Sequence, residues 1–308
     1  MIAAPALVVN PTSGKGRGAR YGERAERALR AAGITPQRIV GRDAHDAAKQ
    51  ARAALDAGAS ALVVVGGDGM VHLGLQLVAG TGTPLGVIPA GTGNDVARYV
   101  GLPLADPEAA ARIVAAGHAA TFDLGRVTSA DSGEPRWFGT VMACGLDSKV
   151  NERANRMRRP RGPSRYTLAL LAELGPFRAL PLDVTIDATH ESVEGMLIAV
   201  GNGPSYGGGM RICPQADPRD GRFQVTVVNR VGKATLLRIF PKVFSGRHAE
   251  HPAVDIRHGS RIELASTAPE PVSVWADGER VGTLPAVCET VAGALTVFVP
   301  ARFVPPPQ

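Results

Sequence analysis

The stretch VVVGGDGMVH, residues 63–72, places one acidic residue among three glycines at the end of an apolar run. The three valines are typical of a buried strand, and they lead directly into the loop GGDG. An apolar helical pattern resumes at Met70 and predicts a helix near 70–79. The stretch therefore predicts a strand, a glycine-rich loop that contains Asp68, and a helix.

The same unit recurs through the first 125 residues or so. Apolar strands are predicted at 6–10, 37–40, 61–65 and 85–89, and amphipathic helices at 18–32, 44–57, 70–79 and 94–100. Apolar strands separated by helices of about 10–15 residues indicate βαβ units and a parallel sheet covered on both faces. In such sheets, ligands bind at the carboxyl ends of the strands.

The second half of the chain has a different pattern. Short strands alternate with turn residues, and helical patterns occur mainly at 147–158, 164–174 and 233–245. This pattern favours a β-sandwich or a curved antiparallel sheet. We therefore expect an α/β protein with an N-terminal parallel-sheet nucleotide-binding domain, 1–125, and a C-terminal β-sandwich domain, 126–289. The segment 290–308 is a candidate addition to the first domain.

Composition narrows the class of protein. The 308 residues are 44% apolar, which suffices for a sizeable core, and no apolar run approaches the ~18 residues of a membrane span. The first residues lack the features of a signal peptide, which predicts a cytoplasmic protein. A net charge of +6 favours anionic partners. With 5% aromatic residues and no recognition motif, nucleic acid is not an expected partner.

Three glycine-rich loops follow strands of the first half: NPTSGKG (10–16), GGDG (66–69) and PAGTGND (89–95). Each leaves the carboxyl end of a parallel strand, so all three should lie at one edge of the sheet. Glycine lets backbone N–H groups approach phosphate oxygens closely, and helix N-termini favour anions. Neither GxxxxGK[ST] nor GxGxxG fits these loops. A carboxylate beside a polyphosphate calls for Mg²⁺ between them, which is the simplest account of Asp68.

In their order and spacing, VVNPTSGKG, VVVGGDG and LGVIPAGTGNDVAR resemble the diacylglycerol kinase catalytic domain. Almost the whole chain is similar to bacterial lipid kinases of the family that includes sphingosine and ceramide kinases. SYGGGMRICPQADPRDGRF (205–223) and WADGE (275–279) resemble motifs of that family's second domain. NAD kinases share GGDG but lack the NPxSG and PxGTGND loops.

The resemblance implies an ATP site in which Gly41 and Met70 depart from the threonines that are usual in the family. Both departures remove a hydroxyl. The implied ATP-binding residues are Asn10, Pro11, Thr12, Ser13, Gly14, Gly41, Gly66, Gly67, Asp68, Gly69, Met70, Val71, His72, Thr92 and Asn94.

The resemblance also implies acids with catalytic roles. A network of Asp68, Asp95 and Asp123 would surround the catalytic Mg²⁺, and Glu279 would be the general base. The residues alone leave other interpretations open. Asp95 suits a helix N-terminus, Asp123 suits a strand-end hydrogen bond, and ADGE (276–279) suits a hairpin turn with exposed acids.

The turn ADPRDGR (216–222) also has two interpretations. It is either an acidic turn before a strand or a structural Mg²⁺ site. In the second interpretation, which the resemblance supports, the Asp220 carboxylate and carbonyl oxygens near Asp217 and Arg222 are the ligands. Hard oxygen ligands in a turn suit Mg²⁺.

Six arginines gather within residues 151–166, which is either a solvated basic surface or a docking site for an anionic membrane. They are Arg153, Arg156, Arg158, Arg159, Arg161 and Arg165. We expect an ATP- and Mg²⁺-dependent lipid kinase, acting on a lipid alcohol such as diacylglycerol at the inner face of the membrane. The sequence is also compatible with a homodimer. The alternatives are an NAD kinase-like enzyme with a soluble substrate and a catalytically silent nucleotide- or membrane-binding homologue.

Overall fold

The structure, a computed structural model, describes residues 4–157, 163–175 and 177–303. The chain divides into two compact units. Unit 1 contains the chain up to Leu124 together with the segment that begins at Ala292, and unit 2 is Gly125–Val291.

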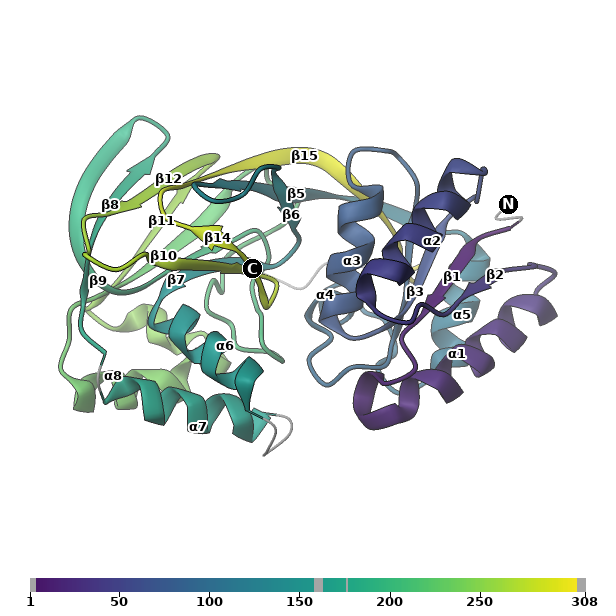
Figure 1. The fold of residues 1–308 in the computed structure, drawn as a ribbon, viewed down its shortest axis with the longest axis horizontal. Helices are drawn as coiled ribbons and strands as arrows, with labels where there is room; N and C mark the ends of the chain where they lie inside the picture. The colour runs from purple at the N-terminus through teal and green to yellow at the C-terminus, as the bar shows by residue number, and fades with distance from the viewer. Residues whose placement is uncertain (1–3, 158–162, 176, 304–308) are drawn as a thin grey trace. The chain divides into compact units, whose positions relative to one another are not determined.

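Unit 1 is a parallel sheet with helices on both faces (Figure 1). The strands lie in the order β2-β1-β3-β4, and the last part of β15 adds to β4 in parallel through Val297 and Leu85. The elements are β1 (Ala6–Val9), α1 (Ser13–Ala31), β2 (Gln37–Ile39), α2 (Ala44–Asp56), β3 (Leu62–Gly66), α3 (Asp68–Val78), β4 (Leu85–Pro89), α4 (Asp95–Tyr99), α5 (Pro107–Ala116), the first part of β5 (Ala119–Ser129) and the last part of β15 (Ala286–Phe298). The predicted parallel α/β sheet is confirmed.

The register of this sheet aligns the strand ends. Val9 lies opposite Val65, and Gly66 lies opposite Pro89, so β1, β3 and β4 finish at one edge. All residues of β1, β3 and β4 are buried, as expected of strands covered on both faces. The three glycine-rich loops therefore start side by side, as their positions in the sequence predicted.

Helix α5 was not among the predicted elements, although its start and end signals are in the sequence. The side chain of Asp106 accepts a hydrogen bond from the Ala109 N–H group at 3.0 Å, and Pro107 is the first helical residue. Gly117 ends the helix in the left-handed conformation. Ala110, Ala111 and Val114 of this helix then pack into the core of the unit.

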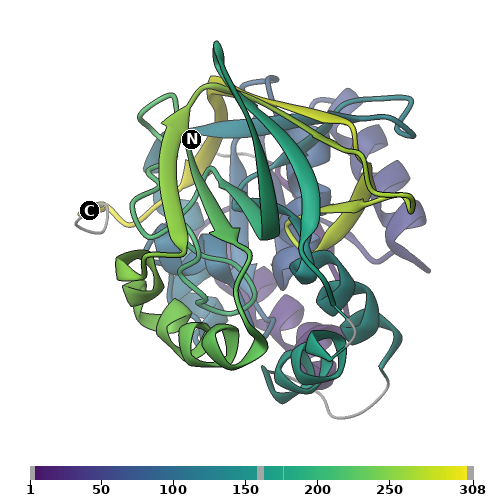
Figure 2. The same ribbon diagram turned by 90° about the vertical axis from the view of Figure 1, so that its left-hand side faces the viewer.

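Unit 2 is built on antiparallel strands that enclose one large apolar core (Figure 2). The strands lie in the order β14-β13-β7-β9-β8-β12-β15, while β10 pairs with both β9 and β11. They are the last part of β5, β6 (Arg136–Phe138), β7 (Val141–Gly145), β8 (Leu180–Ile186), β9 (Thr189–Gly201), β10 (Phe223–Asn229), β11 (Val254–Gly259), β12 (Arg261–Ser266), β13 (Ser273–Ala276), β14 (Glu279–Thr283) and the first part of β15. The predicted β-sandwich domain is confirmed.

Among the residues that the structure describes, three α-helices and two 3₁₀ helices pack beside these strands: α6 (Leu146–Arg156), α7 (Pro163–Leu174), α8 (Lys233–Ile239), η1 (Phe240–Ser245) and η2 (Arg247–Glu250). The helical pattern over 233–245 predicted one continuous helix, but the structure has α8 followed by η1. Pro241 is the reason, because it has no N–H group to continue the α-helical ladder.

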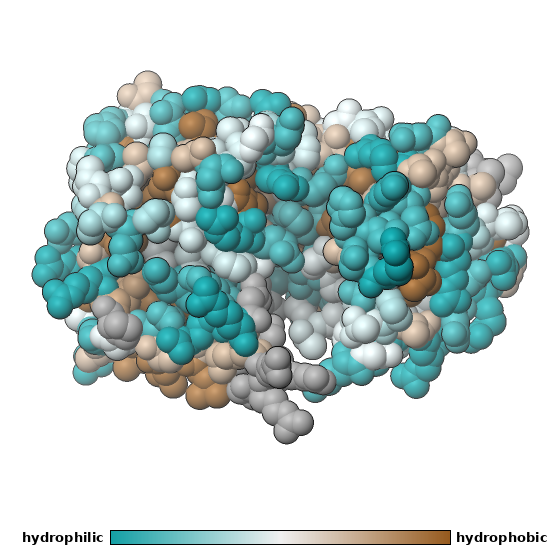
Figure 3. Space-filling model, in the orientation of Figure 1, coloured by the Kyte–Doolittle hydropathy of each residue, from teal (hydrophilic) through white to brown (hydrophobic). Residues whose placement is uncertain are grey.

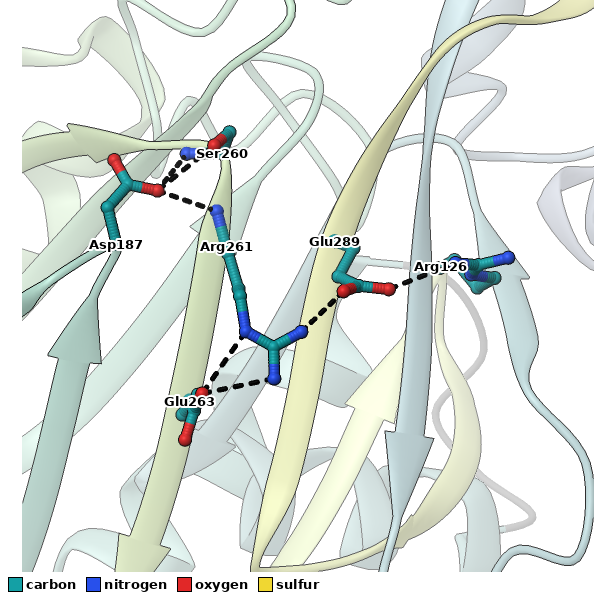
Figure 4. Close-up of polar contacts among 6 residues, drawn as sticks. All are labelled: Arg126, Asp187, Ser260, Arg261, Glu263 and Glu289. Carbon is teal, nitrogen blue, oxygen red and sulfur yellow. Dashed lines mark hydrogen bonds and ion pairs between the residues drawn. The ribbon is translucent and has the colours of Figure 1, made fainter.

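An ion-pair ladder crosses three strands on the surface of unit 2 (Figure 4). Glu289 of β15 lies between Arg126 of β5, at 3.0 Å, and Arg261 of β12. Arg261 also contacts Glu263 at 3.0 Å, and Asp187 accepts hydrogen bonds from the backbone N–H groups of Ser260 and Arg261. The hydrogen bond from Arg126, together with Arg261, lowers the pKa of Glu289. The ladder therefore ties β5 and β12 to the strand between them.

Candidate functional site

The three loops of unit 1 pack backbone against backbone. A Cβ atom on Gly14 would lie 1.9 Å from the carbonyl oxygen of Ala90, and one on Gly91 would lie 2.4 Å from the Cα atom of Gly67. Any other residue at Gly14 or Gly91 would push two loops apart. The glycines are therefore required for the close approach of the loops, whatever they bind.

Asp68 joins the second loop to the third. It is the first residue of α3, and its carboxylate accepts hydrogen bonds from the N–H groups of Asn94 at 2.9 Å and Asp95 at 2.8 Å. Those two N–H groups lie at the start of α4. The carboxylate thus stabilises the conformation of the PAGTGND loop, a structural role that the sequence did not reveal.

Asp95 is buried beside Asp68. Oxygen atoms of both carboxylates lie within 3.4 Å of the point where a Cβ atom of residue 93 would be, and Gly93 leaves that point open. Among the residues that the structure describes, no group of three or more His, Cys, Asp or Glu side chains is arranged to hold a metal. Mg²⁺ in phosphotransfer sites commonly uses one or two carboxylates, waters and the substrate phosphates. Two neighbouring carboxylates fit that mode.

Asp123 is buried on β5, and its Oδ1 atom accepts a hydrogen bond from the Gly293 N–H group at 2.8 Å. This contact ties β5 to β15 within unit 1. Asp123 is thus a hydrogen-bond anchor, as one interpretation predicted, but it lies within β5 and not at a strand end. Its place in an acid network around a metal stays a prediction.

The first loop has an unusual backbone. Gly14, Lys15 and Gly16 have φ values of 57°, 64° and 88°, so three consecutive residues are left-handed and the regular helix begins only after them. Asn10 Oδ1 accepts hydrogen bonds from the N–H group and the hydroxyl of Thr12, at 3.1 and 2.9 Å. This is the local turn that brings the loop back across the strand end.

Two arginines that were not predicted as site residues bind loop carbonyls. Arg17 donates to the carbonyl oxygens of Gly14 at 3.0 Å and Gly91 at 3.4 Å, so it connects the first loop with the third. Arg98 donates to the carbonyl oxygen of Gly93 at 3.0 Å. Arg17 directly follows the first glycine loop in the sequence, and Arg98 lies three residues after the end of the third. A basic residue close behind a glycine loop is the signal that could have indicated them.

The first apolar side chains of α3 are buried and do not face the solvent near the loops. Met70 and Val71 are buried, and a Cβ atom on Gly66 would lie 2.3 Å from the Met70 Cγ atom. Met70 therefore packs over the backbone of Gly66. In place of the threonine hydroxyl that the resemblance led us to expect, the chain has an apolar contact.

Gly41, the other departure, is also explained by packing. A Cβ atom there would lie 2.4 Å from the backbone nitrogen of Ala47, in the first turns of α2. A threonine at this position could fit only if α2 moved away. At Gly41, the backbone of α2 occupies the space that a side chain would need.

In unit 2, the turn ADGE connects β13 and β14, as the hairpin interpretation predicted. Its two acids differ. Asp277 (φ 52°) accepts hydrogen bonds from the N–H groups of Gly139 and Thr140, at 2.9 and 2.8 Å, and from the Thr140 hydroxyl at 2.6 Å. Glu279 is exposed. The turn therefore holds a fixed acid and presents a second one to solvent.

A further carboxyl group in unit 2 has perturbed titration. Burial raises the pKa of Asp147 to about 6, although the hydrogen bonds from Tyr206 and Asn151 act in the opposite direction. Asp147 lies in the first turn of α6, and Tyr206 belongs to the SYGGG motif. Nothing in the sequence pattern singled out Asp147, because a single acid at a helix start is common.

The turn 216–222 is closed by its own contacts. Arg219 binds both carboxylate oxygens of Asp217, at 2.9 and 2.6 Å, and Asp220 Oδ1 accepts a hydrogen bond from the Arg222 N–H group at 2.9 Å. The carbonyl oxygen of Asp217 accepts from the N–H group of Arg219 at 2.7 Å. The Mg²⁺ site with Asp217, Asp220 and Arg222 stays a prediction.

The arginine cluster is described only in part. Arg153 pairs with Glu173 of α7, and Arg156 pairs with Glu152 at 2.6 Å. Arg158, Arg159 and Arg161 lie within 158–162, outside the described residues. The side chain of Arg165 is also not described. No helix within the described ranges has the length and apolar character needed to cross a membrane.

Known proteins match the chain over nearly its whole length. Residues 5–127 match the diacylglycerol kinase catalytic domain, and residues 140–299 match the YegS C-terminal NAD kinase beta sandwich-like domain. The chain is 45% identical over 294 residues to a diacylglycerol kinase of Mycobacterium tuberculosis, covering 95% of this chain and 94% of that protein. It is 28% identical over 300 residues to a diacylglycerol kinase of Staphylococcus aureus, covering 96% of this chain and 91% of that one.

A solved structure agrees on the fold. The crystal structure of a diacylglycerol kinase from Bacillus anthracis superposes with a TM-score of 0.74 at 21% identity, over 98% of both chains. The chain belongs to the diacylglycerol kinase family.

Proposed function

We propose that this protein is an ATP-dependent lipid kinase that transfers the γ-phosphate of ATP to the primary hydroxyl of diacylglycerol, yielding phosphatidic acid. The observation that carries the proposal is the set of three interlocked glycine loops, joined by the Asp68 carboxylate at one edge of a parallel sheet. The names of the relatives support the same activity.

In this proposal, backbone N–H groups of the three loops bind the phosphates of ATP, aided by the N-terminus of α3. Asp68 and Asp95 would hold Mg²⁺, and the ion would supply positive charge to neutralise the phosphates of ATP. Asp68 would do so while it keeps the third loop in place, because each of its oxygens has a second lone pair beyond the N–H contact.

Glu279 is proposed as the general base. The lipid hydroxyl oxygen attacks the γ-phosphorus as its proton passes to the Glu279 carboxylate, and the bond between the γ-phosphorus and the bridging oxygen breaks to release ADP. An exposed carboxylate beside a rigid turn suits this role, since Asp277 fixes the turn and Glu279 is left accessible.

The test is product analysis. The purified chain is incubated with Mg²⁺ and [γ-³²P]ATP in separate reactions with diacylglycerol, ceramide, sphingosine and NAD, and the products are separated by thin-layer chromatography. Labelled phosphatidic acid from diacylglycerol alone is expected, and the Glu279→Gln variant should form it at least about a hundredfold more slowly. Labelled NADP would instead establish an NAD kinase-like enzyme, and no transfer to any acceptor would indicate a catalytically silent homologue.

We further propose two features beside the kinase activity. One is a structural Mg²⁺ at Asp220, with carbonyl oxygens near Asp217 and Arg222, and the other is peripheral association with the inner face of the membrane. The first predicts that millimolar Mg²⁺ raises the melting temperature of the chain but not that of Asp220→Ala. An equal rise in both proteins would contradict the site.

The proposed membrane association is supported by the basic helices of unit 2. The surface that would contact the membrane is specified below.

A further inference from the structure

Unit 2 exposes large apolar side chains on neighbouring helical elements. Leu168 and Leu171 of α7 are 47% and 51% exposed, Leu237 of α8 is 43% exposed, and Phe244 of η1 is 50% exposed. We call these four residues the helical apolar face. Among the described residues, Val40 of unit 1 is the one other large apolar side chain that is exposed to this degree.

Helix α7 is apolar on both its inner and its outer side. Ala169, Leu170 and Leu174 face inward and pack in a core cluster with Leu146 and Val150 of α6. Leu168 and Leu171 are three residues apart and share the outer side. Over 168–174, LALLAEL, Glu173 is the one polar residue. A helix that is apolar all round is normally buried in a core or in a membrane, so the outer side of α7 calls for a partner.

Helix α8 and η1 extend this surface. Leu236 and Phe240 pack against the core cluster of α6 and α7, and Lys233 donates a hydrogen bond to the carbonyl oxygen of Gly175 at the end of α7. Phe244 contacts Phe240 edge to face, with ring centroids 6.1 Å apart. Figure 3 shows apolar surface along the lower edge of unit 2, where Figure 1 draws α7 and α8.

The net charge of the protein is concentrated in the segments of the sequence that contain these elements. Residues 146–178 and 233–250, which contain α6, α7, α8 and both 3₁₀ helices, have twelve Lys and Arg against four Asp and Glu, a net charge of +8. The whole chain has a net charge of +6, so the remaining residues sum to −2. Arg178, Arg238 and Lys242 are exposed on these segments. The apolar side chains therefore lie within the basic region of the molecule.

We propose that the helical apolar face inserts shallowly into the surface of an anionic bilayer, with the surrounding Lys and Arg bound to lipid headgroups. The proposal rests on the proposed function, because diacylglycerol stays in the bilayer and the enzyme must come to it. Apolar side chains beside a basic surface are the features of a helix that lies in the membrane interface. A second copy of the chain is the poorer partner, because docking two such faces would bring like charges together.

The first experiment measures binding without ATP. The full chain and the variant with Leu171→Gln, Leu237→Gln and Phe244→Gln are sedimented with vesicles of phosphatidylcholine, with or without phosphatidylglycerol. The matched control is Val40→Gln, which also removes an exposed apolar side chain. We expect the parent and the control to bind the anionic vesicles, and the triple variant to partition at least about tenfold more weakly. Equal partitioning of all three proteins would overturn the proposal.

A second variant preserves the apolar character of the face. Phe244→Trp should keep full vesicle binding, and the new indole should shift its emission to the blue and be quenched by brominated lipids in anionic vesicles. No lipid-dependent change would show that η1 stays out of the bilayer. If the triple variant instead changes the molecular mass of the protein in solution with vesicle binding intact, the face joins two copies of the chain.

The outcomes for the face and for the activity can be separated. On a short-chain diacylglycerol dissolved as monomers, the triple variant should keep the parent's turnover, whereas on long-chain diacylglycerol in anionic vesicles it should lose about tenfold or more. Equal turnover on the vesicles would refute the docking surface and leave the kinase assignment standing. A parent that phosphorylates neither lipid, yet binds vesicles through these residues, would refute the kinase assignment alone.

Discussion

Two turns, one in each unit, contain an aspartate that fixes another segment of the chain by hydrogen bonds, but the two aspartates differ in their proposed part in the chemistry. In GGDG and in ADGE, an aspartate followed by glycine accepts hydrogen bonds from consecutive residues of another segment. Asp68 binds the N–H groups of Asn94 and Asp95, and Asp277 binds the N–H groups of Gly139 and Thr140. Each carboxylate thereby connects two parts of its unit.

The difference lies in where the proposed chemistry is placed. In unit 1, Asp68 is both the connection between loops and the proposed metal ligand, so stability and activity depend on one side chain. In unit 2, the two roles are divided between Asp277, which has three hydrogen bonds, and Glu279, which is exposed. In the proposed mechanism, the carboxylate that fixes the structure also takes part in the chemistry of unit 1, whereas in unit 2 a neighbouring carboxylate does so.

The strongest test of this comparison is Asp68→Ala. We expect loss of measurable phosphate transfer and a fall of about 3 kcal/mol in the free energy of unfolding, because two charge-assisted hydrogen bonds to the third loop disappear. Activity and denaturant unfolding are measured on one preparation, with Asp56→Ala, an exposed acid of the same unit, as the control. Unchanged unfolding with lost activity would mean that the Asp68 contacts contribute nothing to stability.

Glu279→Gln should separate activity from stability. We expect kcat to fall by roughly 10²–10⁴, because the base is removed while the shape of the side chain is retained. The affinity for ATP and the melting temperature should not change, since Glu279 is exposed. Glu270→Gln, at another exposed acid of unit 2, is the matched control. A loss below threefold would leave Glu279 as a turn residue without catalytic function.

Asp277→Ala should show the opposite balance. Loss of its three hydrogen bonds should lower the free energy of unfolding by about 3 kcal/mol, with a smaller loss of kcat well below the melting temperature. Asp277→Asn keeps an acceptor of the same shape and should recover part of the stability. A loss of kcat as large as that of Glu279→Gln, without any loss of stability, would place Asp277 itself in the chemistry.

The last prediction concerns the pH dependence of the free energy of unfolding, which Asp147 should affect. Its pKa is raised from 3.8 to about 6, so between these values the folded protein keeps a proton that the unfolded chain has lost. The free energy of unfolding therefore falls as the pH rises through that window, by about 3 kcal/mol, and is flat above it. In Asp147→Asn this slope should disappear from denaturant unfolding measured at pH 4 to 7. An unchanged slope would assign the pH dependence to other groups.

The repeating pattern of unit 1 allowed its sheet to be predicted, because buried parallel strands are continuous apolar runs and the loops after them share one edge. The packing between loops could not be predicted in the same way. That Gly41 approaches Ala47, or that Met70 covers Gly66, depends on distances between segments that no local pattern encodes. Both departures from the family therefore looked like lost hydroxyls, although packing now accounts for them.

The roles of the candidate site residues stay predictions, and the hydrogen bonds that hold these residues were not predictable from the sequence. The sequence indicated Asp68, Asp95 and Glu279 as acids of interest, but not which of them would be fixed by hydrogen bonds. The contacts of Arg17 and Asp277 join residues that are far apart in the chain, at separations of 74 for Arg17 and Gly91 and 137 for Asp277 and Thr140. Such contacts appear only once the fold brings the segments together.

The connection between the units has a consequence for synthesis. Unit 2 is inserted between the first part of β5 and the last part of β15, so unit 1 is made in two pieces. Val297 pairs with β4, and Phe298 is buried in the same core as Leu7 and Val63. On the ribosome, all of Gly125–Val291 emerges before this strand does. Because domains generally fold as units during synthesis, unit 2 can be complete while unit 1, whose glycine loops are made first, still lacks its last strand. The two units would then be completed in the reverse of the order in which they are begun.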